Sequence, residues 1–149
     1  MAKRMSMLLK TVCLFGLASI LLSGCGSNSN DPIVSNLVSG NGYNIRMTAS
    51  QETITPGGSV QVTAMVTDST GTPVKDEEEV TFSASEEGTF EGVSDGKAKT
   101  KNGAATAVFR APTQAMNSDK PMPSRSNRIF AGYQGALSYV EVSLVSTTW

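Results

Sequence analysis

The stretch VQVTAMVT at residues 60–67 decides the fold class, because apolar and polar side chains alternate along it with a period of two. The apolar phase holds Val60, Val62, Ala64 and Val66, and the other phase holds Gln61, Thr63, Met65 and Thr67. Successive side chains of a β-strand point to opposite faces, so this alternation predicts a half-buried strand. A helix would instead need apolar residues every three or four positions, and no segment after residue 42 shows that stripe convincingly.

The same alternation recurs on both sides of this stretch. The further apolar phases are Tyr43, Ile45 and Met47; Val80, Phe82 and Ala84; Ala105, Ala107 and Phe109; Ile129, Ala131 and Tyr133; and Val140, Val142 and Leu144. Phe90 stands between Gly88 and Gly92 and marks another short strand. Residues 43–149 are therefore predicted to form one all-β domain of about seven strands.

Turn signals separate these strands at short intervals. They are TPGG at 55–58, DSTGTP at 68–73, SDGK at 94–97, KNG at 101–103 and Gln134-Gly135. Residues 111–128 contain three prolines and no periodicity, which predicts a long loop. Many short strands joined by tight turns favour an immunoglobulin-like antiparallel β-sandwich.

Four motifs, in this order, resemble the bacterial Ig-like domains of invasins and intimins. They are the turn DSTGTPV at 68–74 (with one extra residue), VTF at 80–82, the hairpin entry with Thr100, Gly103 and Ala105, and Ala131 in the penultimate strand. The resemblance covers about residues 54–145 and implies a sandwich carried by a bacterial surface protein. Such domains serve as spacers, adhesin stalks, binding modules and assembly subunits, so the resemblance implies no single task.

The amino-terminal segment has the parts of a secretory signal peptide. Lys3, Arg4 and Lys10 give a basic start, and residues 11–22 (TVCLFGLASILL) carry no charge. A membrane-spanning helix needs about 20 apolar residues, and Lys10 interrupts any run of that length. Residues 1–24 are therefore predicted to be a signal peptide.

The end of that segment, Leu22-Ser23-Gly24-Cys25, resembles the lipobox of bacterial lipoproteins. The resemblance implies a diacylglyceryl group on the Cys25 sulfur, cleavage between Gly24 and Cys25, and acylation of the new amine, for instance by palmitate. Two or three chains anchor a protein stably, whereas one of myristoyl length binds only marginally. Gly26 stands where an Asp tends to retain lipoproteins in the inner membrane, so an outer-membrane location is favoured.

Residues 25–42 are predicted to be the lipidated cysteine and a flexible tether, because residues 26–42 are rich in Gly, Ser and Asn. Within the tether, residues 33–38 (IVSNLV) form a short apolar patch. That patch is either a linker, a strand of the same domain, or a strand offered to the sheet edge of a neighbouring molecule.

Little in the composition supports catalysis or a cofactor. The chain has no histidine, which removes the commonest general base and metal ligand. Its two cysteines both lie in the first 25 residues, and a formal net charge of −1 does not suggest nucleic-acid binding. We therefore predict no enzyme, no cofactor, no metal and no small-molecule substrate.

Three charged clusters carry alternatives. The acidic run 76–79 is either a calcium ligand set or, as we prefer, a solvated loop. The carboxylates Glu86, Glu87 and Glu91 surround Phe90 but have no evident pocket. The alternating lysines at 97, 99 and 101 either bind an anionic ligand or, as we prefer, protect a sheet edge against aggregation.

The sequence thus predicts a non-enzymatic, lipid-anchored envelope protein that displays one Ig-like domain for binding, adhesion or scaffolding, with a protein or polysaccharide partner. One alternative is a subunit of a filament or envelope assembly that uses strand pairing. Another is a carbohydrate-binding or enzyme-accessory module, for which the candidate aromatic residues are Tyr43, Tyr133, Tyr139 and Trp149.

Overall fold

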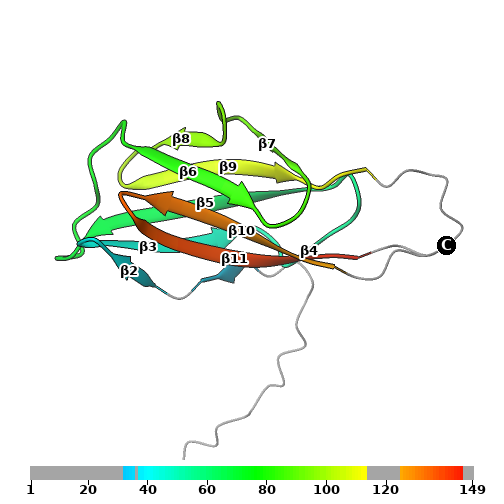
Figure 1. Ribbon diagram of the computed structural model, residues 1–149, viewed down its shortest axis with the longest axis horizontal. Helices are drawn as coiled ribbons and strands as arrows, with labels where there is room; N and C mark the ends of the chain where they lie inside the picture. Colours follow the sequence, from blue (N-terminus) through cyan, green and yellow to red (C-terminus); the bar gives the residue numbers. More distant parts are fainter. Residues whose placement is uncertain (1–31, 36, 114–124, 146–149) are drawn as a thin grey trace, which may run out of the picture.

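The computed structural model describes residues 32–35, 37–113 and 125–145, and these residues form eleven strands and no helix. The first sheet contains β1 (Ile33–Val34), β2 (Val38–Gly40), β3 (Tyr43–Ala49), β5 (Ser59–Asp68), β7 (Thr89–Glu91) and β9 (Ala104–Arg110). The second contains β4 (Thr53–Ile54), β6 (Glu79–Ala84), β8 (Lys97–Lys99), β10 (Arg125–Tyr133) and β11 (Ala136–Leu144). The two sheets lie face to face (Figure 1).

The strand order identifies an immunoglobulin-type sandwich. The first sheet has the order β1-β3-β5-β9-β7, with β2 also on β3, and the second has the order β4-β11-β10-β6-β8. Removing the short strands β1, β2, β4 and β8 leaves β3-β5-β9-β7 and β11-β10-β6. These are the ABED and GFC sheets of an immunoglobulin domain, with the seven strands in chain order. The predicted fold class and its seven principal strands are thus confirmed, although β4 adds a parallel pairing with β11.

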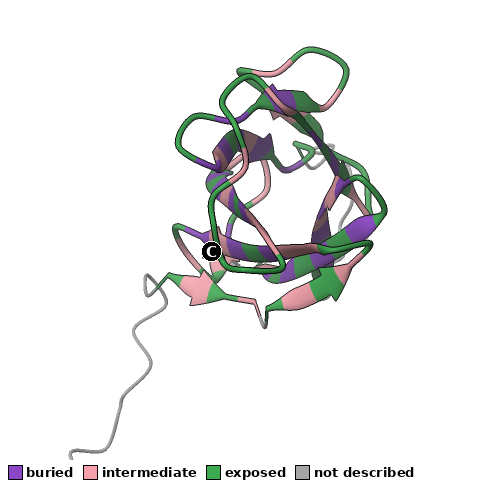
Figure 2. Cartoon of the chain, turned by 90° about the vertical axis from the view of Figure 1, so that its left-hand side faces the viewer, coloured by how far each residue is buried: buried purple, intermediate pink, exposed green. Residues whose placement is uncertain are grey.

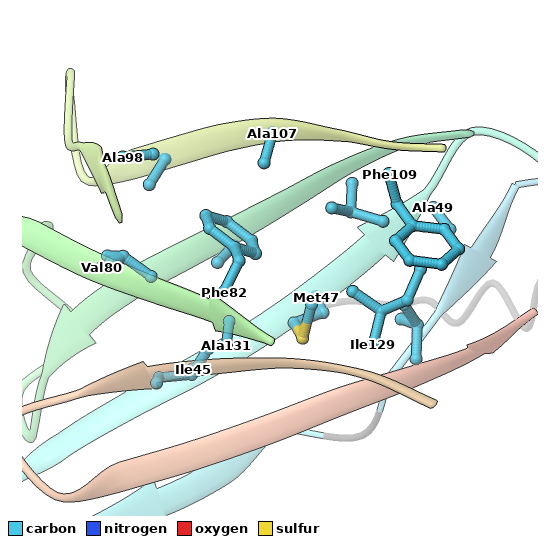
Figure 3. Packing of buried hydrophobic residues seen from close by; sticks show 14 of the residues in the cluster. Ile45, Met47, Ala49, Val80, Phe82, Ala98, Ala107, Phe109, Ile129 and Ala131 are labelled. Carbon is cyan, nitrogen blue, oxygen red and sulfur yellow. The ribbon is translucent and has the colours of Figure 1, made fainter. Parts of the chain in front are cut away.

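The core lies between the inner faces of the two sheets. The alternation in β5 sends Val60, Val62, Ala64 and Val66 inward, and all four are buried. Figure 2 shows the same alternation of buried and exposed positions along the other strands. Phe82 and Phe109 enter the core from opposite sheets (Figure 3), and the ring of Phe90 lies 6.2 Å and 5.4 Å from theirs, centroid to centroid.

The predicted turns are present and explain the hairpin registers. At 55–58 the amide of Gly58 donates to the carbonyl of Thr55 at 2.8 Å, with Pro56 and Gly57 in the centre. Gly57 has a φ of +74°, so this turn is of type II. Positive φ at both central residues marks type I′ turns, the two-residue connections that match strand twist, at 94–97, 101–104 and 133–136.

Two predicted boundaries are wrong. The loop predicted at 111–128 ends earlier, because β10 begins at Arg125; residues 114–124 lie outside the described residues. Residues 125–128 show no apolar phase because their inward position is held by a polar residue, Asn127, which is 1% exposed. Its side-chain oxygen accepts hydrogen bonds from the Ser85 hydroxyl and the Glu86 amide, so burial is compensated at that atom.

The second correction concerns the tether predicted to reach residue 42. Strands β1 and β2 both pair with β3, so the sheet includes residues that the composition assigned to a linker. Ser35 fixes this segment: its amide donates to the Met47 carbonyl, and its hydroxyl accepts from the Met47 amide, both at 2.8 Å. Of the alternatives for residues 33–38, the structure therefore shows strand pairing within the same domain, at Ile33, Val34 and Val38.

Candidate functional site

Aromatic and apolar side chains gather on the outer face of the β10–β11 hairpin. Register pairs Phe130 with Tyr139 and Gly132 with Leu137. Because the intervening residues of both strands point into the core, these side chains must point outward. Tyr139 is 46% exposed and Leu137 is 55% exposed.

Aromatic and charged groups contact one another on this face. The rings of Phe130 and Tyr139 are 5.7 Å apart between centroids, tilted by 50°. The guanidinium carbon of Arg128 lies 5.4 Å from the Tyr139 centroid, within range of a cation–π contact. Arg128 also approaches a carboxylate oxygen of Glu141 at 3.7 Å, and that carboxylate accepts a hydrogen bond from the Ser126 hydroxyl.

We call Arg128, Phe130, Leu137, Tyr139 and Glu141 the β11 face. A flat apolar patch with hydrogen-bonding groups at its border is the composition of a contact surface for another molecule. Gly132, the residue paired with Leu137, has no side chain, so the surface of the patch is recessed at that position.

A groove of about 550 Å³ runs beside the β11 face, between the edge of β11 and the amino-terminal segment. Its lining includes Ile33, Val34, Val38, Glu52, Tyr139 and Glu141. The hydroxyls of Ser35 and Ser138 form a hydrogen bond of 3.1 Å that joins the two walls. In Figure 1, β2 accordingly lies beside β11, and the two strands are in contact.

The acidic run 76–79 is tied into the domain by contacts within the chain. Asp76 accepts from the Asn102 amide at 2.6 Å, and Glu78 accepts from the Tyr133 hydroxyl at 3.3 Å. Within residues 32–35, 37–113 and 125–145, no group of three or more histidine, cysteine, aspartate or glutamate side chains is arranged to hold a metal ion.

The lysine cluster lies where a protective role requires it. Lys97 and Lys99 belong to β8, the edge strand of the second sheet. They form ion pairs with Glu79 at 3.1 Å and Glu77 at 2.7 Å, respectively, and the pKa of Lys99 is raised by its hydrogen bond with Glu77. Lys101 opens the adjacent turn.

The carboxylates around Phe90 are not brought together into a site. Glu91 forms an ion pair with Arg110 at 2.5 Å, and the hydrogen bond from that guanidinium lowers the pKa of Glu91. The backbone amide of Glu86 donates a hydrogen bond to the side-chain oxygen of Asn127. Glu87 is exposed.

The predicted aromatic candidates divide between the core and the surface. Tyr43 and Tyr133 pack edge to face with centroids 4.9 Å apart, and burial raises the pKa of the buried Tyr133. Tyr139 lies on the β11 face, whereas Trp149 lies outside the described residues. Phe130 was not among the residues predicted from the sequence, although its position out of phase with Ile129 and Ala131 indicates the outer face.

Cys25 and Gly24, the predicted attachment and cleavage residues, lie outside the described residues, as do residues 1–24. In the part of the chain that the structure describes, no helix has the length and hydrophobicity needed to cross a membrane.

The sequence matches no known protein-family profile, and no curated protein matches it. Among solved structures, the chain is similar to the "D0-D1 domain of Intimin" at 15% sequence identity and a TM-score of 0.47. That similarity covers 80% of this chain and 83% of the intimin chain.

Proposed function

We propose that this chain is a lipid-anchored protein of the bacterial cell envelope whose sandwich binds a protein or polysaccharide partner without catalysing a reaction. The β11 face carries this proposal, because it gathers an aromatic pair that includes the exposed Tyr139, an arginine and a carboxylate on one hairpin. Aromatic residues and arginine are the side chains most enriched at binding hot spots.

The anchoring part of the proposal is supported by the sequence. A basic start, an apolar segment and Leu22-Ser23-Gly24-Cys25 occur in the order of a lipoprotein signal, and the domain begins only a few residues later. An outer-membrane location is proposed from Gly26.

Metabolic labelling with a fatty-acid probe tests the anchor. The wild-type protein should incorporate the probe, and Cys25→Ala should not. Equal labelling of both proteins would exclude lipidation at Cys25.

The binding role is tested by capturing partners from intact envelopes with the lipidated protein. Tyr139→Ala should reduce specific capture, because it removes the ring that contacts both Phe130 and Arg128. Met65→Ala is the matched control, since Met65 is also exposed, at 41%, but lies on the first sheet. Capture that is indifferent to Tyr139→Ala, or that Met65→Ala reduces equally, would contradict a role for the β11 face.

A second candidate, carbohydrate binding, is favoured by the same ring pair. Sugar rings stack on exposed aromatic faces, and Arg128, Glu141 and Ser126 supply hydrogen-bonding groups at the border. Binding to a glycan array that disappears with Tyr139→Ala and persists with Met65→Ala would identify this class, and the absence of binding to any glycan would remove it.

A further inference from the structure

Among the described residues, β11 has no strand partner along most of the edge opposite β10. On that side, β4 pairs only with Ser143 and Leu144. The Ser143 amide donates to the Glu52 carbonyl and the Val145 amide donates to the Ile54 carbonyl, both at 2.9 Å. Backbone groups alternate in direction along an antiparallel ladder, so the N–H and C=O groups of Leu137, Tyr139 and Glu141 point to the same side.

Of these three residues, Tyr139 and Glu141 line the groove. The groove is lined by Ser138, Tyr139, Val140 and Glu141 on one wall and by the segment that holds β1 and β2 on the other. Within the described residues, β11 pairs with no strand other than β10 and β4. At this edge of the second sheet, the backbone N–H and C=O groups of β11 are therefore available to pair with an added strand.

The side chains at this edge are unlike those that protect the opposite edge of the same sheet. The β8 edge carries Lys97 and Lys99, which discourage strand addition. The β11 edge instead exposes Leu137 and Tyr139, and Val34, 57% exposed, lines the groove together with Tyr139. An open edge with exposed apolar side chains is the arrangement that accepts an added strand.

Charge restricts which strand would fit. Glu52 and Glu141 line the groove, and none of its lining residues is a lysine or arginine. An added strand alternates its side chains between two faces. Its inward side chains would lie over Ile33 and Val38 and should be apolar, whereas its outward side chains would lie beside Glu141 and should be basic.

We propose that the groove binds an extended segment of a partner protein, with alternating apolar and basic residues, as an additional strand of the second sheet. This inference rests on the proposed binding role and names the class of partner. Main-chain hydrogen bonds to Leu137, Tyr139 and Glu141 would supply affinity, and the alternation would supply specificity. The groove offers about 550 Å³ of space for such a segment.

The test uses a capped peptide of sequence VKVKVKV and the mature chain, with amide hydrogen exchange followed by NMR. Binding should slow exchange of the Leu137, Tyr139 and Glu141 amides. The peptide VEVEVEV, which has the same length and apolar phase, should give no protection, because its carboxylates would face Glu52 and Glu141.

Two variants at one position separate backbone pairing from side-chain contact. Tyr139→Pro removes a groove-facing N–H but no hydrogen bond to β10, and proline is tolerated at such edge positions. Tyr139→Pro should weaken peptide binding at least about tenfold, because it removes one main-chain hydrogen bond to the peptide and places the proline ring where the N–H was. Tyr139→Ala keeps the N–H and should weaken binding less. Leu137→Pro provides a second proline variant, and thermal melts confirm which variants fold.

Four outcomes would overturn the inference. They are no protection at millimolar VKVKVKV, equal protection by VEVEVEV, protection at the β8 edge, and equal binding by folded Tyr139→Pro and Tyr139→Ala proteins. Protection of the same amides by the chain alone, rising with its concentration, would assign the edge to a second copy and not to a partner. If the peptides fail while envelope capture persists, the partner uses the β11 face alone; if capture also fails, the binding role itself falls.

Discussion

Gly88 is the position at which one added methyl group should destabilise the sandwich most clearly. A Cβ atom at Gly88 would lie 2.3 Å and 2.4 Å from the Cε2 and Cζ atoms of Phe109, and 2.9 Å from the carbonyl oxygen of Arg110. Phe109 is 0% exposed and contacts the Phe90 ring, so it has no free space to move into. Overpacking of this kind costs about 1–3 kcal/mol, and the carbonyl contact favours the upper end for Gly88→Ala.

The mechanism is tested by a double-mutant cycle with Phe109→Leu, using urea unfolding of the protein. Phe109→Leu alone should cost about 1–3 kcal/mol, because it removes buried ring atoms. It also vacates the space that the new methyl group needs. Gly88→Ala should therefore cost at least about 1 kcal/mol less in the Phe109→Leu background than in the wild type.

Gly92→Ala is the matched control on the other side of β7. Nothing lies within 4 Å of a Cβ at Gly92, but its φ is +78°, so its cost is backbone strain of about 1–2 kcal/mol. That cost should be the same in both Phe109 backgrounds. A Gly88→Ala protein within about 0.5 kcal/mol of the wild type, or costs of Gly88→Ala and Phe109→Leu that simply add, would refute the packing explanation.

Three further predictions concern polar contacts. The pKa of Glu91 is lowered, mainly by its hydrogen bond from Arg110. This pair therefore stabilises the fold fully at pH values above the ordinary pKa of 4.5, and the stabilisation is lost as the pH falls through the lowered pKa. In that acid range, the melting temperature of Glu91→Gln should depend less on pH than that of the wild type. Ser35→Ala should speed hydrogen exchange of the Met47 amide, whose acceptor is the Ser35 hydroxyl, and unchanged exchange would show that β1 is held by other contacts. Asn127→Ala should cost about 0.5–1.5 kcal/mol in urea unfolding, because the Ser85 hydroxyl and the Glu86 amide lose their acceptor; a cost near zero would contradict that account.

The strands that the sequence predicts well are those with an apolar inward phase. The positions Val60 to Val66 in β5 and Val140 and Val142 in β11 alternate without exception, and all of them follow the burial of the structure. The type I′ turns are equally readable, because Asn102-Gly103 and similar pairs can adopt positive φ at little cost. Local chemistry is enough to place both kinds of element.

The elements that the sequence misplaces depend on partners distant in the chain. The first residues of β10 are polar, and the one of them that is buried, Asn127, depends on hydrogen bonds that its side-chain oxygen accepts from Ser85 and Glu86. Strand β1 contains two residues, and its pairing with β3 could not be inferred from a Ser- and Asn-rich context. The β11 face was missed for a related reason: Phe130 and Tyr139 become neighbours only through the hairpin register.

The shortened tether has a consequence for how the proposed anchor and the proposed groove act together. Because β1 begins at Ile33, about eight peptide units separate the domain from Cys25, and a chain of that length spans at most about 28 Å. Ile33 and Val34 also line the groove, so the point where the chain enters the domain and the open edge of β11 lie on the same side of the sandwich. A lipid on Cys25 would therefore hold this edge near the membrane surface. Glu52 and Glu141 would be repelled by anionic lipid head groups, which leaves the edge accessible to a basic segment of a neighbouring membrane-associated protein.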